Sequence, residues 1–153
     1  MTLFIGEADK ADIRAIAALE SAAFGEPCYP VFLFRQAYDL WPELLWCVKE
    51  QQQVIAYLLA APMLNQPKVL NIMSVAVAPN HQGRGIGQLL VSRFCQSQQA
   101  RAQSLWLTVD PQNIPAQRLY KRLGFVVTRH EDDYYHHGEA RLVMELVLPL
   151  KSS

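Results

Sequence analysis

Residues 71–101 read N-I-M-S-V-A-V-A-P-N-H-Q-G-R-G-I-G-Q-L-L-V-S-R-F-C-Q-S-Q-Q-A-R. The apolar run over residues 72–78, which ends at Pro79, predicts a buried strand. A glycine-rich loop follows at residues 82–87. Beyond it, apolar residues recur at the spacing of a helix, namely Ile86, Leu89, Leu90 and Phe94. The stretch therefore predicts a strand, a tight loop and a helix in direct succession.

Such a loop is suited to bind an anion. Its three glycines allow a ligand to approach the backbone closely, and they allow positive φ angles. The first N–H groups of the following helix have no partner within the helix, and that end carries partial positive charge. Arg84 adds a cation that could reach phosphate oxygens. The sequence predicts a phosphate or pyrophosphate site, and the alternative is a turn that caps a helix without a ligand.

The spacing of these glycines excludes two nucleotide-binding motifs. A Rossmann fingerprint and a P-loop both fail, because Gln88 stands where neither motif accepts it. The loop instead resembles the Q/R-x-x-G-x-G/A signature of the GNAT superfamily, the Gcn5-related N-acetyltransferases, and Gln82, Gly85 and Gly87 match it. In that family the backbone amides of this loop hold the pyrophosphate of acetyl-coenzyme A (acetyl-CoA).

Composition limits the class of protein. The 153 residues are 51% hydrophobic and 18% charged, with a formal net charge of zero, which is typical of a compact globular chain. We expect a single domain, residues 1–153, with no nucleic-acid or membrane partner. Three dispersed cysteines fit neither a disulfide framework nor a metal site, so we expect a cytoplasmic protein without a bound metal.

Hydrophobic periodicity predicts the remaining elements. The expected helices cover residues 11–24, 31–40 and 113–123, in addition to the helix from residue 86. The expected strands cover residues 2–5, 44–49, 54–61, 69–78, 104–109, 125–130 and 142–148. This order predicts a mixed α/β sheet, and it is also the order of the GNAT fold. The resemblance implies a mixed central sheet of about seven strands, four flanking helices and two splayed parallel strands at the cofactor site.

A second motif supports the resemblance. Residues 113–125 read N-I-P-A-Q-R-L-Y-K-R-L-G-F and look like the N-x-x-A-x-x-L-Y-x-x-L-G-F segment of the family. The resemblance implies that Tyr120 is the general acid for the departing thiolate and also contacts the cofactor. It assigns the remaining cofactor contacts to Val75, Ala76, Val77, Gln82, Gly83, Arg84, Gly85, Ile86, Gly87 and Asn113.

The general base departs from the family pattern. Ribosomal-protein alanine acetyltransferases of the RimI type have a glutamate where this chain has Thr108, which cannot take a proton near neutral pH. Candidate sources of a base are a water chain, Glu26, or a histidine of the late loop, His136 or His137. The sequence assigns no base. No cysteine matches a nucleophile position, so we expect direct attack in a ternary complex.

The acceptor is expected to lie beside an acidic, aromatic loop at residues 131–139. Tyr134 and Tyr135 begin a run similar to the Y-Y-x-x-G-E-D-A-x-x-M run of RimI-type and Ard1-type enzymes, where the tyrosines hold the first residues of a peptide. Glu26 and Tyr29 similarly resemble the E-N-Y of Ard1-like enzymes. A solvated hairpin is the alternative reading of this loop.

Three functions remain open from the sequence. We favour an acetyl-CoA-dependent N-acetyltransferase, a monomer or homodimer, that acts on a protein or peptide N-terminal amine. The first alternative is an enzyme for a small amine of the arylalkylamine or polyamine type, because residues 30–43 are similar to arylalkylamine-type enzymes. The second is an acyl-CoA-binding sensor without catalysis, which the missing strand glutamate would explain.

Overall fold

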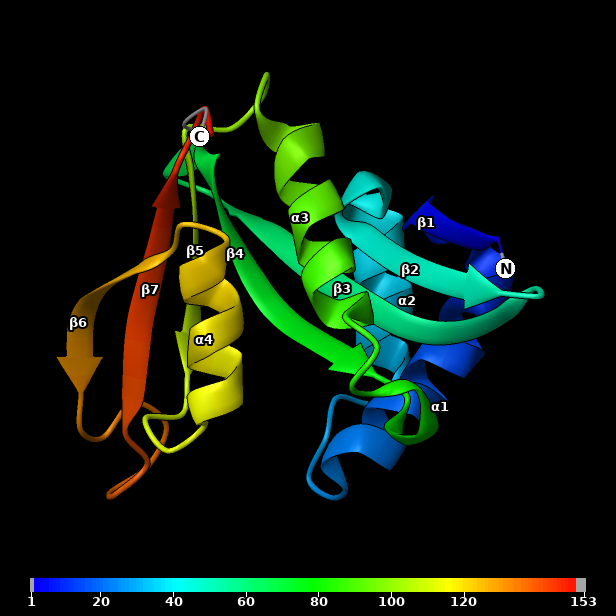
Figure 1. The fold of residues 1–153 in the computed structure, drawn as a ribbon, viewed down its shortest axis with the longest axis horizontal. Helices are drawn as coiled ribbons and strands as arrows, with labels where there is room; N and C mark the ends of the chain where they lie inside the picture. The colour runs from blue at the N-terminus through cyan, green and yellow to red at the C-terminus, as the bar shows by residue number, and fades with distance from the viewer. Residues whose placement is uncertain (1, 151–153) are drawn as a thin grey trace. The chain divides into compact units, whose positions relative to one another are not determined.

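A computed structural model describes residues 2–150 of the chain. Within that range, four α-helices, seven strands and three 3₁₀ turns alternate along the chain (Figure 1). The strands are β1 (Leu3–Glu7), β2 (Leu45–Glu50), β3 (Gln53–Met63), β4 (Gln66–Val77), β5 (Ser104–Val109), β6 (Val126–Glu131) and β7 (Arg141–Val147). The helices are α1 (Ile13–Phe24), α2 (Val31–Leu40), α3 (Ile86–Gln98) and α4 (Ile114–Arg122). Hydrogen bonds order the strands β1-β2-β3-β4-β5-β7-β6, which confirms the predicted mixed α/β sheet.

The chain folds into two compact units. The first comprises residues 2–61 and 74–94, and the second comprises residues 62–73 and 95–150. The expectation of a single domain over residues 1–153 stays a prediction, and residues 1 and 151–153 lie outside the described range. No helix among residues 2–150 is long and apolar enough to cross a bilayer.

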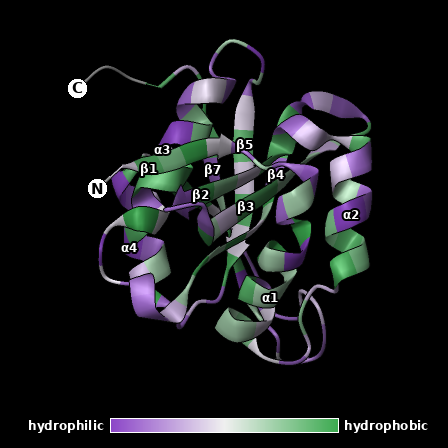
Figure 2. Cartoon of the chain, turned by 90° about the vertical axis from the view of Figure 1, so that its right-hand side faces the viewer, coloured by the Kyte–Doolittle hydropathy of each residue, from purple (hydrophilic) through white to green (hydrophobic). Residues whose placement is uncertain are grey.

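The first unit is built around strands β1, β2 and β3, which pair antiparallel in that order. In Figures 1 and 2, α1 and α2 lie on one face of these strands and α3 on the other. The ring of Phe34 on α2 packs edge-on against Tyr57 of β3, with 5.2 Å between their centroids, and both side chains are fully buried. On the α3 side, Trp46 packs against the buried Phe94 at 5.5 Å. Aromatic contacts therefore fix both helical layers to the sheet.

A two-residue hairpin joins β2 and β3. Its residues Gln51 and Gln52 have φ angles of +52° and +67°, and Glu50 pairs with Gln53 across the turn. Two successive left-handed residues match the right-handed twist of the flanking strands. The expected strands over residues 44–49 and 54–61 leave residues 50–53 as their connection. Left-handed glutamines are uncommon, so the sequence gave no signal of the geometry of this turn.

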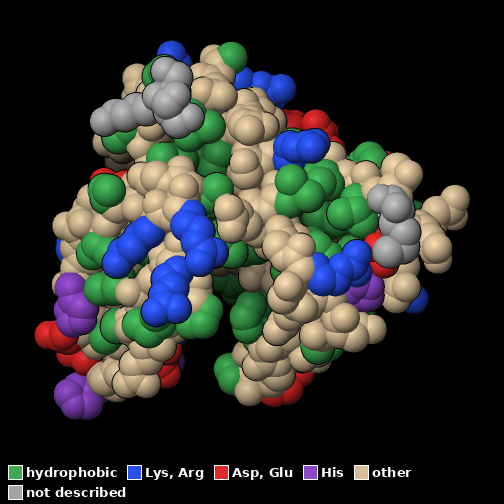
Figure 3. All heavy atoms as spheres, viewed as in Figure 1, with side chains coloured by type: hydrophobic (Ala, Val, Ile, Leu, Met, Phe, Trp, Pro, Cys, Tyr) green, Lys and Arg blue, Asp and Glu red, His purple; other side chains and the backbone are tan. Residues whose placement is uncertain are grey.

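The second unit contains a parallel contact between β4 and β5. Residues 69–71 pair with residues 104–106, and the Asn71 side chain donates to the Trp106 carbonyl oxygen at 3.2 Å. Strand β7 pairs antiparallel with both β5 and β6, so β6 forms the edge of the sheet. Helix α4 lies over these strands in Figure 1. Its exposed face carries Arg118, Lys121 and Arg122, seen as the blue group over α4 in Figure 3.

Predicted and observed helix boundaries differ most at the start of α1. Helix α1 was expected from residue 11, but a 3₁₀ turn occupies Lys10–Asp12, because the Asp12 carboxylate accepts the Asp9 N–H at 2.8 Å. This reciprocal cap fixes the entry to the helix before the α-helical turns begin. Pro30 precedes α2 as its N-cap, in an extended conformation. Helix α2 itself spans the predicted residues.

Candidate functional site

The glycine-rich loop has the backbone geometry that a bound anion requires. Gly83 and Gly85 have φ angles of +82° and +76°, where a side chain would be strained. Apart from the glycine itself and its two chain neighbours, no atom lies within 4 Å of the position that a Cβ would take at either residue, so open space adjoins the backbone. Leu89 donates its N–H to the Gly85 carbonyl oxygen at 3.0 Å, and this bond begins α3. The N–H groups of the first turn are therefore directed at the loop.

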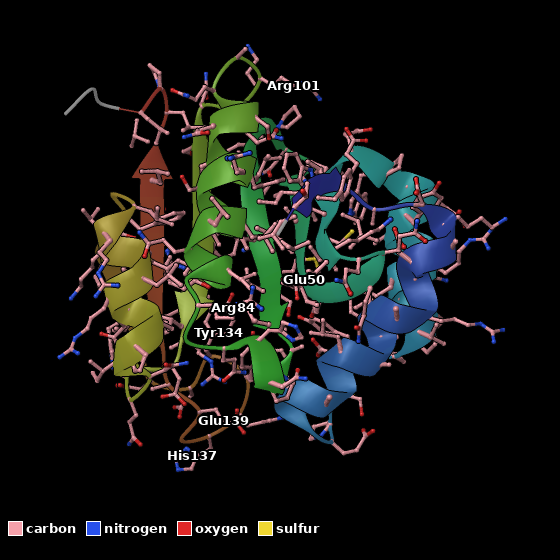
Figure 4. All side chains as sticks on the ribbon, turned by 45° about the vertical axis from the view of Figure 1, so that its right-hand side comes forward. Glu50, Arg84, Arg101, Tyr134, His137 and Glu139 are labelled. Carbon is pink, nitrogen blue, oxygen red and sulfur yellow. The ribbon has the colours of Figure 1, made fainter. Side chains whose placement is uncertain are left out.

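Side chains fasten this loop to the neighbouring strands. Gln82 donates from Nε2 to the carbonyl oxygen of Val77, the last residue of β4, at 3.2 Å. Arg84 donates from Nη2 to Oε2 of Glu50 at 2.9 Å, and Figure 4 labels both side chains. His81 Nε2 lies 3.5 Å from the other Glu50 oxygen. The predicted phosphate ligand Arg84 is thus already paired, and its hydrogen bond lowers the pKa of Glu50.

The end of β4 leads straight into this loop. Ala76 is buried, whereas Val75 and Val77 are half-buried. Ala78 donates its N–H to the Ile55 carbonyl oxygen at 2.8 Å, which holds the strand end against β3. The first unit therefore places the predicted contacts at residues 75–77 next to the loop that begins at Gln82.

The second unit contains the predicted acid. Tyr120 is half-buried on α4, and its ring contacts Phe125 edge-on at 5.7 Å. Burial, with a smaller contribution from Cys95, raises the pKa of Tyr120 to about 12. Its hydroxyl is protonated at neutral pH, as that of an ordinary tyrosine is, and the raised pKa extends this to more alkaline pH. Asn113 is the N-cap of α4, and its side-chain oxygen accepts the Ala116 N–H at 3.2 Å.

The acidic, aromatic loop joins β6 to β7 in the second unit. Tyr134 and Tyr135 pack edge to face with 4.8 Å between ring centroids, and the Arg141 guanidinium lies 5.0 Å from the Tyr135 ring. Figure 4 labels Tyr134, His137 and Glu139 on this loop. A pocket of about 500 Å³ adjoins it, lined by Asp110, Pro111, Gln112, His130, Asp132, Gly138, Glu139, Ala140 and Arg141. The two tyrosines therefore pack against each other, and three carboxylates, one arginine and one histidine line the hollow that adjoins their loop.

The loop between α1 and α2 is bound to Glu20 of α1, a residue that the sequence did not single out. Glu26 is exposed, but the Tyr29 N–H donates to the buried carboxylate of Glu20 at 3.0 Å. Tyr57 and Ser74 also hydrogen bond to Glu20. Glu20 lies four residues after the buried Ile16, which places a charged residue on the apolar stripe of α1. That position was the sequence signal that could have identified Glu20 as a buried polar group.

The predicted residues fall into two groups, one in each unit. The first unit holds the strand end, the glycine-rich loop, Glu26 and Tyr29, whereas the second holds Asn113, Tyr120, Tyr134 and Tyr135. Each group occupies the elements that the sequence predicted. Their union into one site stays a prediction.

Comparison with known proteins places this geometry in context. Residues 13–125 match the model of the Acetyltransferase (GNAT) family. A streptothricin acetyltransferase from Streptomyces lavendulae is 35% identical over 85 residues, which cover 52% of this chain and 45% of the relative. A [ribosomal protein bS18]-alanine N-acetyltransferase from Haemophilus influenzae is 32% identical over 87 residues, covering 56% of this chain and 57% of the relative. The chain therefore aligns with about half the length of these two relatives.

A solved structure shares the whole fold. Ard1 from Thermoplasma volcanium superposes with a TM-score of 0.86 over 97% of this chain and 99% of the other, at 21% sequence identity. At that identity the likeness concerns the fold. It agrees with the fold that the two sequence motifs predicted.

Proposed function

Because the chain belongs to the GNAT acetyltransferase family, we propose that it transfers an acetyl group from acetyl-CoA to a primary amine, with a protein or peptide N-terminus favoured. The observation that carries this proposal is the loop at Gly83 and Gly85. These two glycines have left-handed backbone angles, directly precede α3 and adjoin open space. Pyrophosphate is the part of the donor that such a loop suits. The family's acyl donor is acetyl-CoA, so donor and loop agree.

The protein groups supply two needs of the reaction. The carbonyl oxygen becomes negative when the amine attacks, and backbone N–H groups around Val75 and Val77 would stabilise that charge. The thiolate must take up a proton as it leaves, and Tyr120 would donate it, since a tyrosine hydroxyl is protonated at neutral pH. Acetyl transfer then proceeds directly between the two bound substrates. Asn113, which caps α4, would contact the cofactor arm.

A protein N-terminus is favoured as acceptor by the two tyrosine sites. Tyr134 and Tyr135 are fixed by mutual packing, and Tyr29 is tied to α1 through its backbone. Rigid aromatic side chains bind a peptide at little cost in conformational entropy. The related bS18-alanine enzyme, by its name, acetylates such a terminus. A cytoplasmic location fits the three free thiols, Cys28, Cys47 and Cys95, and the active form would be a monomer or homodimer.

A small amine is the second candidate acceptor. The streptothricin relative is an acetyltransferase of a small molecule, and it is the more identical of the two relatives over the aligned part. The pocket of about 500 Å³ beside Asp110, Asp132 and Glu139 is acidic and would attract a cation.

A thiol-release assay separates these candidates. The wild-type protein is given acetyl-CoA with, in turn, N-terminal peptides, arylalkylamines and polyamines, and free coenzyme A is measured. Turnover on peptides with a preference for their first residues is the expected result. Turnover on free amines alone would instead support the small-molecule enzyme. No turnover, together with tight binding of acetyl-CoA by calorimetry, would contradict the enzyme and favour a sensor.

A further inference from the structure

Glu20 is a buried carboxylate that the proposed reaction has not yet used. Glu20 is only 4% exposed and lies on the apolar face of α1. A buried charge of this kind is costly unless hydrogen bonds satisfy it. Three groups lie within hydrogen-bond distance of it: the Tyr29 N–H at 3.0 Å, the Tyr57 hydroxyl, and the Ser74 hydroxyl at 3.4 Å. The single Ser74 proton can point to Tyr57 instead, 2.6 Å away. The carboxylate is therefore held between α1, β3, β4 and the loop that follows α1.

The two hydroxyls form a continuous path from Glu20 to a more accessible atom. Tyr57 is fully buried, and its oxygen lies 2.6 Å from the Ser74 oxygen. Ser74 itself is half-buried. Burial raises the pKa of Tyr57, so this residue keeps a proton and passes one on only when it receives another. Ser74 is consequently the end of the path that a substrate could contact.

The path lies at the predicted reaction centre of the first unit. Ser74 directly precedes Val75 on β4, the first of the residues proposed to hold the donor. At the other end, Glu20 binds the backbone of Tyr29, a residue proposed to hold the acceptor. The strand predicted to supply a base has Thr108 instead. A proton acceptor connected to Ser74 would fill that role.

We propose that Ser74 takes a proton from the acceptor amine and that Glu20 stores it, through Tyr57. This inference rests on the proposed function. The amine nitrogen of the acceptor becomes cationic and strongly acidic when its lone pair forms a bond to the thioester carbonyl carbon. A carboxylate is then a strong enough base to take its proton. One proton moves from nitrogen to Ser74 as Ser74 gives its own to Tyr57 and Tyr57 gives its own to Glu20.

The remaining bonds balance as follows. The carbon–sulfur bond breaks, and sulfur takes the Tyr120 proton to form coenzyme A. After the product leaves, Glu20 returns its proton through Tyr57 and Ser74 to solvent, and Tyr120 takes one up from solvent. Ser74 is the catalytic residue in this scheme, because it touches the amine. Tyr57 and Glu20 act through it as positioning residues.

Two substitutions and one control test the relay. Ser74→Ala removes the contact atom, Glu20→Gln removes the final acceptor, and Ser74→Thr keeps a hydroxyl at the same position. We expect kcat to fall about 10²-fold in Ser74→Ala and Glu20→Gln, the size typical of a lost general base, with KM for both substrates nearly unchanged. Ser74→Thr should restore most of kcat. The acceptor is the best substrate of the wild-type panel, and melting temperature and acetyl-CoA affinity are measured alongside.

Each outcome decides the matter. Loss of kcat in Ser74→Ala, with rescue by Ser74→Thr and unchanged acetyl-CoA affinity, supports the relay. A wild-type enzyme that is active while Ser74→Ala keeps its kcat within twofold overturns the relay alone. If Ser74→Ala loses kcat but also binds acetyl-CoA more weakly and melts at a lower temperature, the relay is overturned as well. The network would then have a structural role. A wild-type protein without turnover on any acceptor overturns the proposed function and the relay together.

Discussion

At the scale of single residues, burial changes the acidity of Tyr120, the proposed acid. Its pKa rises to about 12 because the ring packs beside Phe125 and the hydroxyl is shielded from water. The sequence placed Tyr120 at a family position, but the shift depends on burial, which no motif reports. Glu20 was not predicted as a site residue, because its hydrogen-bond partner Tyr57 lies 37 residues away in the sequence.

Tyr120→Phe removes the proposed acid and keeps the ring. We expect kcat to fall about 10²-fold or more, while the Kd for acetyl-CoA changes little, because the hydroxyl acts mainly as the thiolate leaves. Steady-state kinetics and calorimetry measure the two quantities. Tyr38→Phe on α2 is the matched control and should keep wild-type kcat. Equal turnover in both variants would remove Tyr120 from the mechanism.

At the scale of elements, the loop between β4 and α3 was predictable because its signals are local. Glycine spacing and apolar periodicity lie within about thirty residues of sequence, and the observed strand, loop and helix follow them. The pairing of Arg84 with Glu50 was not predictable. It depends on the β2–β3 hairpin, which brings together residues 34 positions apart. Positive φ angles at Gln51 and Gln52 form that hairpin without glycine.

Gly85→Val tests the loop as an anion site. A side chain there meets no protein atom, but it would enter the space next to the backbone and strain a φ of +76°. We expect acetyl-CoA binding to fall below detection by calorimetry, with a folded protein by circular dichroism. Gly138→Val, at a φ of +81° and with similar free space in the β6–β7 loop, is the matched control. Unchanged acetyl-CoA affinity in Gly85→Val would contradict the phosphate-loop assignment.

At the scale of the whole molecule, fold class and family followed from two motifs in the right order, and the matched model over residues 13–125 confirms the family. The seven-stranded mixed sheet confirms the predicted fold class. The union of the loop and Tyr120 in one site was implied by the family resemblance and stays a prediction. It depends on long-range packing, which local patterns do not encode. The choice of acceptor likewise depends on the shape of the surface that binds it, so the identity of the acceptor stays a proposal.

Stability of the whole chain should fall at alkaline pH. Burial raises the pKa of Tyr57, and raises that of Cys47, Cys95 and Tyr120 to about 12. These groups keep their protons in the folded state while the unfolded chain loses them, from about pH 8.5 for cysteine and 10 for tyrosine. Folding is therefore stabilised below those values and loses about 1.4 kcal/mol per pH unit per group above them.

Urea unfolding, followed by tryptophan fluorescence at pH values from 7 to 11, measures this loss. The midpoint is expected to stay constant to about pH 8 and to fall steadily beyond it. Tyr120→Phe should reduce the slope above pH 10, since one titrating group is gone. Equal midpoints at pH 7 and 11 would contradict the burial of these groups.

The central claim, acetylation of a protein or peptide N-terminus, is tested most directly by measuring the mass and the acetylation site of a single peptide. The peptide begins with alanine, as the name of the bS18-alanine relative suggests, and contains one internal lysine. It is incubated with acetyl-CoA and the wild-type protein, then fragmented in a mass spectrometer. The account predicts one added acetyl group, on the α-nitrogen of the first residue. An unmodified peptide, or an acetyl group on the lysine alone, would contradict it.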